Sequence, residues 1–129
     1  MRTLVLLLSA ALPAALPAKK EQLKPAVIEV VAATAHRDQN NLNIDGHIRN
    51  TGERPAAKLV IIVDILDSDK QPLTTMKGGS EPESIDPGAE GEFHAQMPAP
   101  PRAVFFRLSF EEASGGDLKA VNEGPFTIE

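Results

Sequence analysis

The sequence predicts an all-β domain, an antiparallel β-sandwich of about seven strands, preceded by an N-terminal signal peptide. Apolar and polar residues alternate strictly over residues 41–49, which is the pattern of a half-buried strand. Turn-forming residues recur about every ten positions, and no segment after residue 18 has helical spacing. These observations together favour strands joined by short turns.

Residues 1–18 have the order of a secretory signal peptide. Arg2 supplies the basic start, an apolar run begins at Leu4, and small residues end at Ala18, where we expect cleavage. An uncleaved anchor is the alternative, although the apolar run is short against the roughly 20 residues that a spanning helix needs. We therefore expect an exported protein, periplasmic or secreted, that contacts the membrane only if this segment is retained.

Cleavage after residue 18 of the 129 residues would remove one positive charge, so that the net charge changes from −5 to −6. The remaining residues fit a flexible leader over 19–25 and a single domain over 26–129. A domain of this size folds without disulfides, and the chain contains no Cys. Because phosphate binding requires clustered Lys and Arg, the acidic charge argues against a nucleic-acid partner.

The strands are expected in the following order. Residues 26–35 are rich in Val, Ile and Ala, and residues 41–49 place apolar side chains on one face. A turn that contains Pro55 separates them from the most apolar strand, residues 57–66. A tight turn over 67–70 then leads to a short strand over 73–76.

The second half begins with the longest loop, residues 77–89, which is rich in Gly, Pro and charged residues. Alternation resumes over 91–97 and again over 104–110, with a proline break between them. A Gly-Gly turn leads to the last strand, which ends at residues 126–128. This series is typical of an immunoglobulin-like sandwich, and the residues expected in its core are Ile44, Ile48, Ile61, Val63, Phe93, Phe106 and Leu108.

Three short motifs resemble those of FxLYD-type immunoglobulin-like domains of exported bacterial proteins, over roughly residues 27–112. Residues 46–52 are similar to the Gly-x-Val-x-Asn-x-Gly strand and turn of that family. Residues 63–67 stand where Phe-x-Leu-Tyr-Asp is expected, with Val63 and Leu66 in place of Phe and Tyr. Residues 85–88 are similar to its Leu-x-Pro-Gly turn. The resemblance implies a binding or accessory role, because the family has no assigned catalytic activity.

Two histidines, His47 and His94, fall on the polar faces of the second and fifth strands, which are neighbours in an immunoglobulin-like order. With Asp45 or Glu92 they could offer metal ligands, whereas solvated positions on a strand surface explain them equally well. This arrangement defines the alternative function, a metal-binding or small-molecule-binding protein of the cell envelope. No resident cofactor is expected. A calcium reading of Asp64 and its neighbours lacks the required spacing, so a hairpin turn is favoured.

An apolar outer surface is the other candidate site. If one face of the 57–66 strand packs into the core with one face of the 104–110 strand, the alternation turns Val60, Ile62 and Phe105 outward, beside Asp64 and Arg107. The alternative is that another segment covers this surface. We expect a partner that is itself an envelope or secreted protein.

An enzyme is not expected. The chain has no Trp or Tyr for stacking sugars, no Gly-x-Ser-x-Gly turn and no glycine-rich phosphate loop. No nucleophile lies at a supporting distance along the sequence from a base. The expected function is therefore a non-catalytic protein–protein interaction module.

Overall fold

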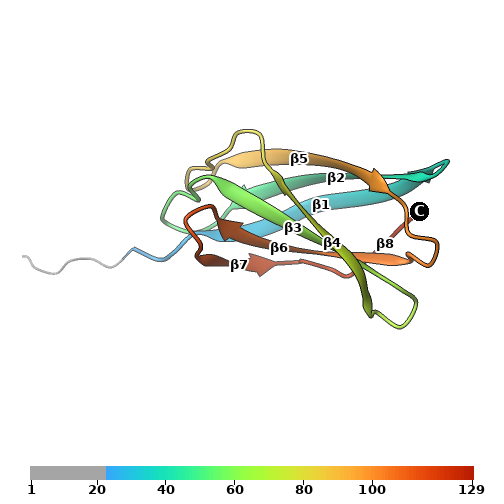
Figure 1. Ribbon diagram of the computed structural model, residues 1–129. Helices are drawn as coiled ribbons and strands as arrows, with labels where there is room; N and C mark the ends of the chain where they lie inside the picture. Colours follow the sequence, from blue (N-terminus) through green and yellow to red (C-terminus); the bar gives the residue numbers. More distant parts are fainter. Residues whose placement is uncertain (1–22) are drawn as a thin grey trace, which may run out of the picture.

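The computed structural model describes residues 23–129, which form strands and connecting turns (Figure 1). The signal peptide predicted over 1–18 and most of the leader predicted over 19–25 lie outside these residues. None of the described segments is a helix that could cross a membrane. The strands are β1 (Val27–Asp38), β2 (Asn41–Asn50), β3 (Leu59–Leu66), β4 (Pro72–Gly79), β5 (Glu90–Pro98), β6 (Phe105–Glu112), β7 (Asp117–Val121) and β8 (Phe126–Thr127).

The strands follow one another in a nearly closed sheet of order β4-β3-β6-β7-β1-β2-β5, with β8 beside β6. The two ends of this order, β4 and β5, do not pair with each other, so the sheet has one open seam. The expected purely antiparallel arrangement is wrong at one place, because β1 and β7 run parallel over residues 27–29 and 119–121. The sheet is therefore mixed. Alternation within a strand sets which side chains face inward but not which strand lies alongside.

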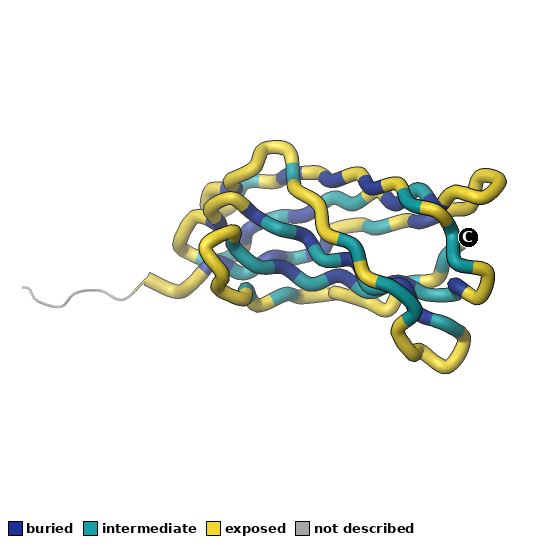
Figure 2. Tube along the Cα trace, in the orientation of Figure 1, coloured by how far each residue is buried: buried dark blue, intermediate teal, exposed yellow. Residues whose placement is uncertain are grey.

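The strands form two layers in Figure 1, with β1, β2 and β5 side by side in one and β3, β4 and β6 in the other. Buried positions lie along the strands between these layers (Figure 2). All seven residues expected in the core are buried, from 0% exposure at Phe106 to 6% at Phe93. Burial of such side chains contributes about 1.5–3 kcal/mol each.

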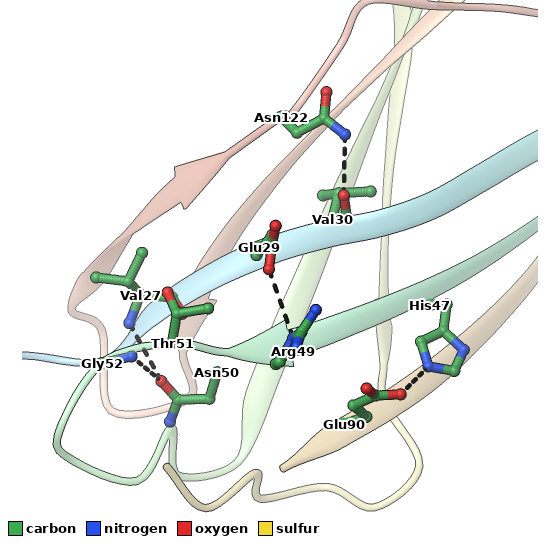
Figure 3. A network of polar contacts seen from close by, with 10 residues as sticks. All are labelled: Val27, Glu29, Val30, His47, Arg49, Asn50, Thr51, Gly52, Glu90 and Asn122. Carbon is green, nitrogen blue, oxygen red and sulfur yellow. Dashed lines mark hydrogen bonds and ion pairs between the residues drawn. The ribbon is translucent and has the colours of Figure 1, made fainter. Parts of the chain in front are cut away.

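Asn50, at the end of β2, is the one buried polar residue of the described chain. Its Oδ1 accepts hydrogen bonds from the backbone N–H groups of Val27 at 3.3 Å and Gly52 at 2.9 Å (Figure 3). Its Nδ2 donates to the carbonyl oxygens of Arg54 at 2.8 Å and Ile85 at 3.0 Å. One side chain thus joins the start of β1, the turn after β2 and the loop before β5.

Gly52 in this turn has no room for a side chain, because an added Cβ would lie 2.1 Å from the carbonyl oxygen of Pro25. The close approach brings the turn against the residues that enter β1. This is the reason for glycine at the last position of the motif over residues 46–52.

The long loop expected over 77–89 is shorter than predicted, because β4 continues through Gly79. Ile85, within this loop, is fully buried and its backbone forms a two-way bridge with Ala56. The loop therefore closes one end of the core.

The last strand is broken into β7 and β8 by residues 122–125. Asn122 takes a positive φ of 63°, and its Nδ2 donates to the carbonyl oxygen of Val30 at 2.9 Å (Figure 3). Beyond the break, Phe126 returns to β6, where its ring lies 5.1 Å from that of Phe106. At the chain end, the Glu129 N–H donates to Ala35. The last strand thus bonds to both layers and joins them on the side opposite the open seam.

Candidate functional site

The outer face of the β1–β2–β5 layer is polar because alternate residues of all three strands point away from the core. On β2, Ile44 and Ile48 are fully buried whereas Asp45 is exposed. The register sets Asp45 opposite His94 of β5 and sets His47 opposite Glu92. The expectation that the second and fifth strands are neighbours is confirmed.

His47 and His94 on this face each pair with a carboxylate. His94 Nδ1 donates to Asp45 Oδ1 at 2.7 Å, directly across the strand pair. His47 Nε2 donates to Glu90 Oε1 at 2.5 Å, diagonally across it (Figure 3). The hydrogen bond from His47 lowers the pKa of the Glu90 carboxyl group below its ordinary value, with a further contribution from the positive charge of His47 when protonated.

The two imidazoles do not meet at one point. No group of three or more His, Cys, Asp or Glu side chains suitable for a metal ion occurs within residues 23–129. His47 and His94 lie diagonally across the β2–β5 pair, and each has its own carboxylate partner. The metal hypothesis for these two residues stays a prediction.

A cleft of about 530 Å³ lies where these strands approach the end of β4. Three carboxylates border it, and no Lys or Arg does. Short stretches of β1, β2 and β5 and the residues that leave β4 line it: Ala32, Ala33, Thr34, Asp45, Gly46, His47, Gly79, Ser80, Glu81, Glu92, Phe93 and His94. The cleft is therefore acidic.

Gly46 and Phe93, which are opposite each other in register, form the middle of this region. The Phe93 ring lies over Gly46, so closely that an added Cβ would sit 1.9 Å from a ring carbon. Glycine is required at this position because the ring occupies the space of a side chain. The alternation of Gly46 with Ile44 and Ile48 indicates that Gly46 faces inward, but the sequence does not identify the ring that packs over it.

The far edge of β5 carries unpaired backbone groups over most of its length. Glu92 exchanges two backbone hydrogen bonds with Glu81, at 2.8 and 3.0 Å, on the side away from β2. Since backbone groups of alternate residues point to the same edge, those of His94 and Gln96 face the same way. Beyond the Glu81 bridge, no other segment of residues 23–129 pairs with this edge. No pattern in the sequence indicates this free edge, because edge position depends on the whole strand order.

The five residues of the predicted surface lie on β3 and β6, and their binding role stays a prediction. The two strands pair, with Asp64 opposite Arg107, and all five predicted residues, Val60, Ile62, Asp64, Phe105 and Arg107, are half-buried. The row that contains Asp64 and Arg107 separates Ile62 from Phe105, so the apolar surface is not continuous. Asp64 accepts a hydrogen bond from Thr75 Oγ1 at 2.8 Å.

The turn after β3 is the hairpin that was favoured over a calcium loop. Asp67 Oδ1 accepts hydrogen bonds from the backbone N–H groups of Asp69 and Gln71. Lys70 in the same turn lies over the ring of Phe105, with Nζ 5.3 Å from the ring centroid. Phe105 is thereby partly covered by the β3–β4 hairpin.

No protein-family model and no curated protein matches this sequence. Among solved structures, the chain is similar to IrmA from Escherichia coli, with a TM-score of 0.51 and 13% identity, covering 82% of this chain and 98% of that one. It is also similar to part of a β-glucosidase from Kluyveromyces marxianus, with a TM-score of 0.38 and 13% identity, covering 82% of this chain and 14% of that one. The likeness to IrmA supports the all-β fold alone, and the weaker likeness adds nothing to it.

Proposed function

We propose that this protein is an exported, non-catalytic protein–protein interaction module, periplasmic or secreted. The proposal for export is supported by the signal-peptide pattern of residues 1–18. The proposal that it is not an enzyme is supported by the side chains that line the cleft. They include carboxylates and imidazoles but no Cys or Lys. The hydroxyl of Ser80, which also lines the cleft, donates to the carbonyl oxygen of Pro82 and not to a base.

The finer fold that we propose is an immunoglobulin-like sandwich of the FxLYD type. It is supported by the pairing of β2 with β5 in one layer and of β3 with β4 and β6 in the other. The motif over residues 46–52 adds to this support, because its Gly and Asn positions have the close-packing roles described above.

The observation that carries the functional proposal is the free edge of β5. A row of unpaired N–H and C=O groups on a strand is a template for a strand from another chain. His94 and Gln96 present such groups next to the open seam, between the Glu81 bridge and Pro98, which lacks an N–H. A partner that adds a strand here would extend the β1–β2–β5 layer.

The test is affinity capture of crosslinked partners with a tagged chain of residues 19–129, from the envelope or secreted fraction of the native source. The informative variant is His94→Pro, since proline removes an N–H from the free edge and leaves the ladder with β2 intact. Its matched control is His94→Ala, which removes the imidazole and keeps the backbone donor. We expect a specific partner with the parent and the alanine variant, and loss of that partner with the proline variant.

A second pair of changes, Ile62→Lys with Phe105→Glu, tests the β3–β6 surface in the same capture. Circular dichroism and thermal unfolding check that every variant remains folded. A partner lost only with this double variant would move the binding surface to β3–β6. Retention of the same proteins by all variants would contradict the interaction proposal at both surfaces.

A further inference from the structure

We propose that the segment bound at the β5 edge is an extended stretch of a partner protein in which Lys or Arg alternates with apolar residues. This inference rests on the proposed function and specifies the chemistry of the partner. It follows from what borders the edge on its two sides, because a strand added to a sheet turns alternate side chains to opposite faces.

The inner side of the seam is apolar and open. Phe93 and Ala95 are the two most exposed members of the buried core, at 6% and 9%, and Met97 beside them is half-buried. Across the seam, Gly78 of β4 lies opposite the buried Ile61, and a Cβ added to it would meet no atom within 4 Å. Apolar side chains of an added strand would therefore meet the half-buried Met97 at the margin of the core and free space beside Gly78.

The outer side of the same edge is negatively charged. Glu92 of β5 is exposed, Glu81 stands at the end of the free stretch, and neither side chain has a bond within the described residues. Glu90 and Asp45 lie beside them and are bonded to His47 and His94. The side chains of His94 and Gln96 continue this face without adding a fixed positive charge. Lys or Arg at alternate positions of an added strand would complement these carboxylates, whereas Asp or Glu would be repelled.

The free edge of β4 is less suited to the same partner. It begins with Pro72 and carries Lys77, whose Nζ lies 3.4 Å from Glu111 Oε1. Proline and lysine are residues that protect edge strands from pairing. The occupant is therefore assigned to β5.

The probes are two synthetic peptides of about eight residues, long enough to span the free stretch at about 3.3 Å per residue. One alternates Lys with Val, and the other alternates Glu with Val. Binding of each peptide to the protein of residues 19–129 is measured by isothermal titration calorimetry at low and at high salt. We expect the Lys peptide to bind more tightly than the Glu peptide and to weaken as salt rises.

Three variants assign the binding to the edge. His94→Pro should weaken the Lys peptide at least about tenfold through lost main-chain hydrogen bonds, while His94→Ala should not. Glu92→Gln should weaken it about twofold to fivefold, the range of one exposed ion pair. The same change at Glu123→Gln, in the turn between β7 and β8, should have no effect.

Equal binding of the two peptides, or binding of the Lys peptide that His94→Pro leaves unchanged, would overturn the inference. Sedimentation of the protein alone gives a further check, because a dimer that His94→Pro dissociates would make a second copy of this chain the occupant and would also overturn it. If the native partner is lost with His94→Pro while the Lys peptide fails to bind, the interaction function stands and only the partner chemistry is wrong. If both assays are negative, both proposals fail.

Discussion

Replacement of Asn50 by Ala should destabilise the fold more than any other single polar substitution in β2. The change removes four hydrogen bonds. The N–H groups of Val27 and Gly52 and the carbonyl oxygen of Arg54 lose their partner, whereas the carbonyl oxygen of Ile85 keeps the N–H of Ala56. At about 1 kcal/mol for each, with less for the 3.3 Å contact, the expected loss is about 3–4 kcal/mol. This is a large part of the roughly 5–15 kcal/mol that stabilises a typical domain.

Urea unfolding measures the loss directly. With a slope of about 1.5 kcal/mol per molar urea, the midpoint should fall by about 2 M while the slope itself stays unchanged. Asn43→Ala is the matched control, because Asn43 lies on the same strand, is half-buried, and its side chain forms no hydrogen bond within the described residues. Its expected effect is below about 0.5 kcal/mol.

A third variant, Asn50→Asp, separates the donor from the acceptor role. It keeps an acceptor for Val27 and Gly52 but sets a carboxylate against the carbonyl oxygens of Arg54 and Ile85. Acidification, which protonates the introduced group, restores one donor and should reduce the deficit relative to the parent. Equal midpoints for Asn50→Ala and Asn43→Ala would refute the whole argument.

Two further predictions concern the β1–β2–β5 layer. Gly46→Ala should cost about 1–3 kcal/mol in thermal or urea unfolding, because the ring of Phe93 must leave its position; an unchanged midpoint would show that the ring moves freely. Glu90, whose pKa is lowered by His47, favours the folded state above the ordinary carboxyl pKa, and this contribution is lost as pH falls through the depressed value. In a carboxyl-detected NMR titration, His47→Ala should raise the pKa of Glu90, and an unaltered titration would rule out the His47 hydrogen bond as its cause.

The alternation of residues in the chain was sufficient to predict the all-β class and the positions of most strands. It placed β2, β3, β5 and β6 and every predicted core residue, because inward and outward positions depend only on neighbours in sequence. The parallel pairing of β1 with β7 was not predictable in this way. It depends on the break at residues 122–125, where Asn122 and Gly124 take positive φ values and let the last strand bond to both layers.

The candidate site was predicted less completely than the fold. Sequence reasoning brought His47 and His94 to one face, but their carboxylate partners depend on the register between β2 and β5. The buried roles of Asn50 and Ile85 arise from contacts between residues 35 apart in the chain. The free edge of β5 was hidden for the same reason, since it is defined by which strand is absent from its side.

The parallel pair of β1 and β7 gives the domain a direction of mechanical strength. β1 leads from the N-terminal end of the domain, while the chain after β7 runs to the opposite end, where the C-terminus lies (Figure 1). Tension between the two ends would pull these adjacent strands in opposite directions along their length. Their hydrogen bonds would then be loaded together in shear, so a domain held at one end and pulled through the other would resist extension instead of unzipping one bond at a time.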